Sequence, residues 1–84
     1  MNACVITFRS VTPAQRGEQI LKKAGMACSL QRTPRWMEEK GCGYCLQIQT
    51  DRIGEITGLL RKNAVGYRKV YRLHPDGETE EIRL

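Results

Sequence analysis

The sequence contains few aromatic residues, a single histidine and no long apolar run. Its 84 residues include one Phe, one Trp, three Tyr and one His. No apolar stretch approaches the ~20 consecutive residues that a membrane-spanning helix requires, so we expect no membrane partner. A chain of this length supports one modest core. We therefore expect a single domain over residues 1–84, which excludes a large two-substrate enzyme.

Acidic residues are scarce outside the C-terminal tail. Residues 1–75 contain 13 Lys and Arg against five Asp and Glu, whereas residues 76–84 contain four acids and one Arg. The net charge of +5 is therefore concentrated in the body of the chain. Such a surface attracts anions, either nucleic acid, an acidic partner, or an oxyanion such as phosphate or selenite. A solvated basic surface without a partner is the alternative.

The sequence also lacks an export signal, because Met1-Asn2-Ala3 has no basic region ahead of an apolar one. We therefore expect a cytoplasmic protein, in a bacterial-type cytoplasm that keeps thiols reduced. Cys4 and Cys28 lie in apolar strand patterns, where a free cysteine packs as a small hydrophobic residue. The other two cysteines, Cys42 and Cys45, lie in a different context.

The apolar pattern predicts strands and helices in the order β-α-β-β-α-β, followed by a hairpin. The expected strands cover residues 3–8, 26–31, 44–49, 67–73 and 78–84. We expect Thr12 to cap the first helix, Pro13 to take its first helical position, and Gly25 to end it. Asp51 is the expected N-cap of the second helix.

This order is typical of an α+β, ferredoxin-like split β-α-β fold. We expect an antiparallel sheet with two helices on one face. Residues 4–72 would form the core of the domain, and residues 73–84 would form a C-terminal β-hairpin extension around the turn signal His74-Pro75-Asp76-Gly77.

The connection over residues 32–43 is the densest candidate for function. Connections of this length in a small domain tend to be functional. Cys42 lies between Gly41 and Gly43, and the cations Arg32 and Arg35 precede it. Because nearby cations favour the reactive thiolate, Cys42 could be a nucleophile or a carrier of transferred sulfur or selenium. The alternative is a turn whose cysteine is incidental.

Cys45 completes a CxxC motif, Cys42-Gly43-Tyr44-Cys45, and is a possible second thiol. In redox proteins such a pair opens a helix, whereas this pair enters a predicted strand. A dithiol pair would therefore require the strand to begin after Cys45. We expect no metal and no cofactor, because there is no second CxxC and His74 is the only histidine.

Aromatic residues give weaker signals. Trp36 could shield the connection or anchor a partner, although local packing is the commoner role. Tyr67, Lys69 and Tyr71 share one strand parity and could bind RNA on an open sheet. The third strand offers no stacking ring beside them, so the sequence disfavours nucleic acid as a partner.

Four segments together resemble one known family. The segments are Val5-Ile6-Thr7-Phe8, Leu21-Lys22-Lys23-Ala24-Gly25, Thr33-Pro34-Arg35 and Gly41-Cys42-Gly43. They resemble the selenium/sulfur carrier-like domain over residues 4–72. This resemblance implies a ferredoxin-like domain whose carrier site is the loop Cys42-Gly43. The chain departs from the family pattern at Cys45 and in the tail from His74.

We therefore expect a carrier that holds sulfur or selenium on Cys42, rather than a complete enzyme. Its partners would be donor and acceptor proteins, and the chain itself would be a monomer or a weak homodimer. The expected binding residues around the thiol are Arg32, Thr33, Pro34, Arg35, Trp36, Gly41 and Gly43. The alternative is a non-catalytic binding module whose basic surface docks an acidic protein or RNA.

Overall fold

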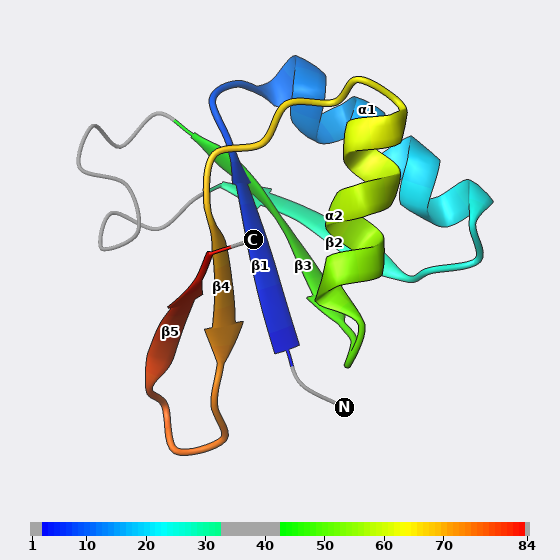
Figure 1. Cartoon of the computed structure of the whole chain (residues 1–84). Helices are drawn as coiled ribbons and strands as arrows, with labels where there is room; N and C mark the ends of the chain where they lie inside the picture. The colour runs from blue at the N-terminus through cyan, green and yellow to red at the C-terminus, as the bar shows by residue number, and fades with distance from the viewer. Residues whose placement is uncertain (1–2, 33–42, 84) are drawn as a thin grey trace.

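The computed structural model describes residues 3–32 and 43–83 (Figure 1). It contains five strands and two helices within these ranges. In chain order they are β1 (Ala3–Phe8), α1 (Val11–Lys23), β2 (Cys28–Arg32), β3 (Tyr44–Gln49), α2 (Ile53–Lys62), β4 (Val70–Leu73) and β5 (Thr79–Ile82).

The five strands form one antiparallel sheet in the order β2-β3-β1-β4-β5. β3 lies between β1 and β2, which α1 connects, and β1 lies between β3 and β4, which α2 connects. This confirms the predicted α+β class, the antiparallel sheet and the two helices. β5 adds a fifth strand beside β4, so the sheet order differs from that of a simple four-stranded split β-α-β.

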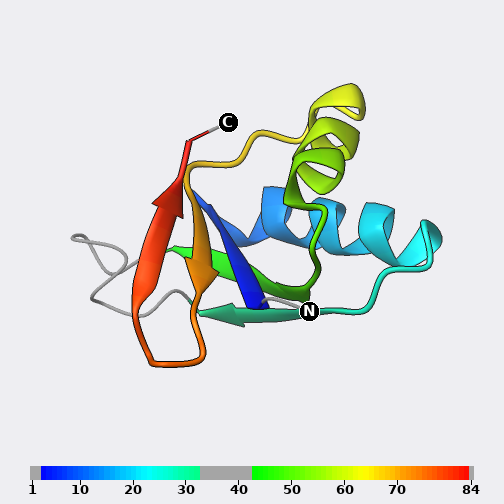
Figure 2. The same ribbon diagram turned by 60° about the horizontal axis from the view of Figure 1, so that its bottom comes forward.

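Both helices lie on the same side of the sheet, as Figure 2 shows. Strand residues of one parity point toward them, because successive side chains in a strand alternate between faces. The core between the layers is apolar, and its burial supplies the main stabilisation of the fold. Its buried members are Cys4, Ile6, Phe8, Ala14, Leu21, Leu46, Ile48, Ile53, Ile56, Leu60, Val65 and Val70.

The first helix begins earlier than the sequence predicts. Its N-cap is Ser10 in extended conformation, so Thr12 lies inside the first turn rather than at the cap. Pro13 is still tolerated, because N–H groups of the first turn have no partner within the helix. The predicted end is confirmed: Gly25 adopts a φ of +82°, and the Met26 N–H donates to the Leu21 carbonyl at 2.9 Å.

The second helix and two strands also differ from prediction by a few residues. Arg52, not Asp51, is the N-cap of α2. The strand after α1 begins at Cys28 instead of Met26 and includes Arg32. β4 begins at Val70, three residues after the predicted start. The predicted turn between β4 and β5 is confirmed, because the His74 N–H donates to the Glu78 carbonyl at 2.8 Å.

Neither helix in the described part of the chain has the length and apolarity needed to cross a bilayer.

Candidate functional site

The structure places three of the nine predicted site residues, namely Arg32, Gly43 and Cys45. Arg32 is the last residue of β2 and is exposed, and Gly43 is buried immediately before β3. The other six fall outside the described residues; they are Thr33, Pro34, Arg35, Trp36, Gly41 and Cys42.

Arg32 and Gly43 lie at the same end of the sheet. Arg32 is paired with Tyr44, the first residue of β3, and Tyr44 is paired with Phe8, the last residue of β1. The chain therefore leaves β2 and enters β3 where β1 also ends. Gly43, which directly follows Cys42 in the sequence, therefore lies at this end of the sheet.

Cys45 lies in β3 and is buried, with only 2% of its surface exposed. It is paired with Thr7 on one side and Gln31 on the other, on the sheet face opposite the helices. Alternation along the predicted strand 44–49 places Cys45 on the solvent-facing side, opposite Tyr44 and Leu46. Its burial beside Thr7 corrects that prediction. The dithiol alternative requires a strand that begins after Cys45, whereas β3 begins at Tyr44.

The two remaining described thiols are poor nucleophiles. Cys4 is fully buried, and burial raises the pKa of its thiol, although the Arg72 guanidinium nearby opposes that shift. Burial also raises the pKa of the partly exposed Cys28 thiol, and the Glu18 carboxylate adds to the shift. Both thiols therefore stay protonated near neutral pH, and a thiol reacts far more slowly than a thiolate.

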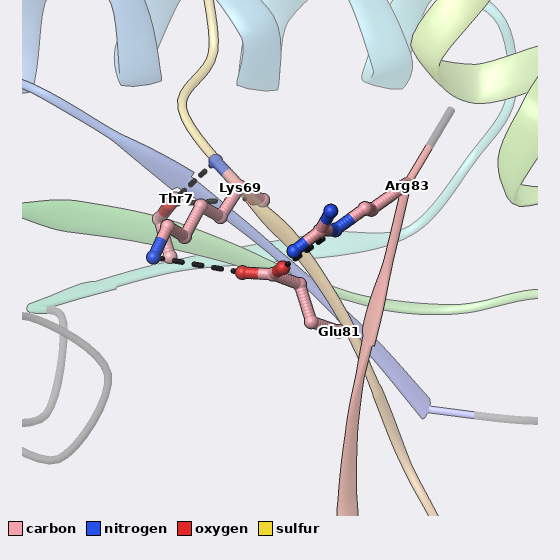
Figure 3. Close-up of polar contacts among 4 residues, drawn as sticks. All are labelled: Thr7, Lys69, Glu81 and Arg83. Atoms are coloured by element: carbon pink, nitrogen blue, oxygen red, sulfur yellow. Dashed lines mark hydrogen bonds and ion pairs between the residues drawn. The ribbon is translucent and has the colours of Figure 1, made fainter.

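A buried hydroxyl organises the same end of the sheet, as Figure 3 shows. Thr7 Oγ1 accepts a hydrogen bond from the Lys69 N–H at 3.0 Å and donates one to the Lys69 carbonyl at 3.3 Å. The Arg68 N–H donates to the Thr7 carbonyl at 2.8 Å. Two consecutive residues thus face Thr7, which fixes how Arg68 and Lys69 enter β4.

An ion-pair chain continues from Lys69 to the last strand (Figure 3). Lys69 Nζ lies 3.5 Å from Glu81 Oε1, and Arg83 Nε lies 3.4 Å from Glu81 Oε2. The Glu81 carboxylate therefore bridges two cations. Exposed pairs of this kind stabilise a fold very little, so the cations remain available to a partner.

Two open hollows lie at this end of the sheet and share Tyr67 and Arg68. One, of about 360 Å³, runs between the start of β4 and the end of β5 and includes Lys69 and Arg83. The other, of about 340 Å³, lies at the start of α1 and includes Arg9. The Tyr67 hydroxyl accepts hydrogen bonds from Arg61 at 2.7 and 3.1 Å, which holds the ring between the two hollows.

Sequence reasoning did not group four of the cations at this end of the sheet, although it named Lys69 as a residue that could bind RNA. The four residues are Arg9, Arg68, Lys69 and Arg83. Each lies within two residues of a strand end, and the strand order brings those ends together. The positions of the cations relative to the predicted strand ends, combined with the predicted topology, would have revealed them.

Within the described residues, no three His, Cys, Asp or Glu side chains lie close enough to hold a metal ion.

Residues 3–72 match the sequence model of one protein family, described as "Putative Se/S carrier protein-like". The match runs from β1 into β4 and includes the whole segment between β2 and β3. β5 lies beyond it. The comparisons with curated proteins and with solved structures found no match.

Proposed function

The chain belongs to the Se/S carrier protein-like family, and from this premise we propose that it carries sulfur or selenium on the thiol of Cys42. The family match supports carriage of a chalcogen, and the resemblance seen in the sequence is thereby confirmed. The choice of thiol rests on one structural observation. The described thiols are buried or hold a raised pKa, which leaves Cys42 as the candidate.

The proposed loading step is an exchange between sulfur atoms. The Cys42 thiolate attacks the terminal sulfur of a donor persulfide, R–S–SH. A new S–S bond forms on Cys42, the donor S–S bond breaks, and the donor leaves as the thiolate R–S⁻ with the bonding electron pair. The products are Cys42–S–SH and R–S⁻, so no external oxidant is consumed. A donor R–S–SeH would deliver selenium by the same step, and unloading is its reverse toward an acceptor thiolate.

The position of Arg32 supports the thiolate form of Cys42. Arg32 is exposed at the end of β2, where the segment containing Cys42 departs, and a nearby cation favours an anionic sulfur. We assign the same role to Arg35, and we assign access of the partner's sulfur to Gly41 and Gly43. Thr33, Pro34 and Trp36 complete the proposed binding segment.

The proposal also includes the compartment, the partner proteins and the fold type. The protein would work in the cytoplasm as a carrier between a donor and an acceptor protein, without completing a reaction by itself. Strands β1 to β4 would be a ferredoxin-like unit, with β5 as an addition. The interleaved order β2-β3-β1-β4 supports that assignment.

Limited alkylation tests the choice of thiol. The reduced protein is treated with less than one equivalent of iodoacetamide at neutral pH, and the labelled peptides are then mapped by mass spectrometry. We expect the label on Cys42, because Cys4 and Cys45 are buried and Cys28 has a raised pKa.

The same reaction in urea is the control, because unfolding removes the protection and should bring the four labelling rates close together. Preferential labelling of Cys4, Cys28 or Cys45 in the folded protein would refute the assignment.

A further inference from the structure

The strand ends gather five cations at one end of the sheet, which we call the basic end. β1 and β2 finish there, β4 begins there, and β5 returns to it, as the strand register requires (Figure 1). The cations are Arg9, Arg32, Arg68, Lys69 and Arg83, and all five are exposed.

Acidic residues are distributed to the opposite end. Among the strand-end residues that the structure describes, Glu81 is the carboxylate at the basic end, and it is paired with Lys69 and Arg83. The far end carries acids in the loop after β3, the first turn of α2 and the β4–β5 hairpin. These acids are Asp51, Glu55, Asp76, Glu78 and Glu80. Arg52 and Arg72 lie beside two of these acids, Glu55 and Glu80. Among the described strand-end residues, cations therefore dominate the basic end and acids outnumber cations at the far end, and such an uneven distribution orients an approaching charged partner.

The basic end is too broad for a small anion alone. Strands are spaced ~4.8 Å apart, so the four intervals from β2 to β5 span roughly 19 Å. Its cations come from four separate segments, and all but Arg32 line two hollows rather than one central pocket. Such a surface fits another macromolecule, whose charges meet it over a wide area.

The neighbouring sheet face favours a protein over a nucleic acid. Proteins that hold single strands combine cations with aromatic rings on which the bases stack. The helix-free row nearest the basic end pairs Gln31, Cys45 and Thr7 across β2, β3 and β1, and none of these is aromatic. Tyr71 lies one row further from this end. Tyr67 lines both hollows, but its hydroxyl is hydrogen-bonded to Arg61, whose guanidinium lies 5.7 Å from the ring centroid. The basic end therefore lacks the row of open rings on which successive bases stack.

We propose that the basic end docks an acidic surface of the protein that exchanges sulfur or selenium with this carrier. The partner's role in exchanging sulfur or selenium rests on the proposed function. The docking surface itself is inferred from charge and topology. Because the segment with Cys42 is attached at Arg32 and Gly43, docking here brings the partner to the carrier thiol. The attraction should weaken with salt, as exposed charges are screened.

A titration with a defined carboxylate chain tests the surface. The full ¹⁵N-labelled chain is titrated with a short poly-L-glutamate peptide, and with an oligouridylate of equal charge, at low and high salt. We expect poly-L-glutamate to shift the amides of the five basic-end residues, to bind more tightly than the oligouridylate, and to be released by salt.

Two triple variants with the same loss of charge separate location from net charge. Arg9→Gln, Arg68→Gln and Arg83→Gln together should weaken poly-L-glutamate binding roughly tenfold, since three exposed charge pairs are lost. The control variant, Lys22→Gln, Lys23→Gln and Arg52→Gln, removes three cations away from the basic end and should change binding less than about twofold. Thermal unfolding checks that both variants are folded.

Equal weakening by both triple variants would overturn the proposal, because net charge alone would then explain binding. Tighter binding of the oligouridylate at the same amides would replace it with a nucleic-acid surface, and the absence of basic-end shifts would remove the surface altogether. Cys42→Ser should leave poly-L-glutamate binding unchanged. Failure of Cys42 to accept a chalcogen would therefore refute the carrier function without affecting this result.

Discussion

Thr7 shows how one buried hydroxyl sets the entry into a strand. It is 2% exposed, and its Oγ1 both accepts from and donates to the backbone of Lys69. Without that oxygen the Lys69 N–H would lose its partner, and an unpaired buried donor costs more than an ordinary hydrogen bond contributes. The hydroxyl therefore positions both Lys69 and the preceding Arg68 at the basic end.

Thr7→Val should lower the free energy of unfolding by about 1–2 kcal/mol. Valine keeps the shape of the threonine side chain, but the Lys69 N–H loses its acceptor. Urea denaturation measures the change. The matched control is Thr57→Val. Thr57 is equally buried, but its Oγ1 donates only to the Gly54 carbonyl one turn earlier in α2. We expect a cost below about 0.5 kcal/mol there. Equal costs at the two sites would contradict the role given to Thr7.

Among the described residues, Ala64 is the non-glycine residue with a positive φ. It follows the C-cap of α2 with a φ of +58°, and the Val65 N–H donates to the Leu60 carbonyl at 2.9 Å. Gly25 occupies the corresponding place after α1 without strain, because it lacks a Cβ. The two helices thus end by the same motif, and only one of them uses glycine.

Ala64→Gly should raise the free energy of unfolding by about 1 kcal/mol, because glycine adopts positive φ without a steric penalty. Ala24→Gly is the matched control, since Ala24 caps α1 with a φ of −81°. That control should lower stability by about 0.5 kcal/mol through the entropy of the unfolded chain. Thermal unfolding of both variants measures the difference, and a loss of stability in Ala64→Gly would be the contradicting result.

At the scale of elements, Gly17 allows α1 to pack closely on the sheet. A Cβ at this position would lie 3.2 Å from Leu46 Cδ1 and 3.3 Å from Phe8 Cζ. Both neighbours are fully buried, so neither can move away easily. The glycine weakens the helix by propensity but allows the contact between the layers.

Gly17→Ala should therefore lower the free energy of unfolding by about 1–2 kcal/mol, because a crowded core outweighs the gain in helix propensity. Gly58→Ala in α2 is the control, since nothing lies within 4 Å of a Cβ there. It should raise stability by about 0.5–1 kcal/mol. Denaturant titrations compare the two, and stabilisation of both variants would show that α1 is not tightly packed at Gly17.

Much of this arrangement of elements could be predicted from the sequence, because alternating and helical apolar patterns report directly on burial. Element ends were harder to predict. The favourable cap spacing at Thr12 competes with Ser10, which is the actual N-cap of α1. The pattern predicts a strand from Tyr67, but β4 begins at Val70 and the Tyr67 hydroxyl accepts a hydrogen bond from Arg61. Local propensity cannot resolve the start of β4, because the backbone of Lys69 is hydrogen-bonded to Thr7 of the distant strand β1.

The candidate site was predictable only in part. Arg32 and Gly43 could be found because they lie beside the Cys-Gly motif. Burial of Cys45 could not be predicted, because alternation places it on the solvent-facing side of the sheet. Its paired neighbour, Thr7, comes from a strand that is far away in the sequence. The other basic-end cations are scattered along the chain, and only the strand order brings them together.

At the scale of the whole molecule, the distribution of charge and the positions of the described thiols both support the proposed carrier function. The basic end is the end at which Arg32 and Gly43 lie, and these are the described residues that flank the segment with Cys42. Cys4 and Cys45 are buried within the sheet, and Cys28 lies on β2 with a raised pKa. Under the proposed function, the basic end would bring an acidic partner to Cys42, while the described thiols are buried or hold a raised pKa.

The central claim is that Cys42 carries the chalcogen, and direct loading tests it. The reduced protein is incubated with glutathione persulfide, and its intact mass and peptide map are then measured. The parent protein should gain one sulfur atom on the Cys42 peptide, and Cys42→Ser should gain none. Cys28→Ser is the matched control, because Cys28 is the most exposed of the described thiols and so the nearest competitor. This control should load as the parent does. Undiminished loading of Cys42→Ser, or sulfur recovered on the Cys28 peptide instead, would contradict the assignment of the carrier thiol.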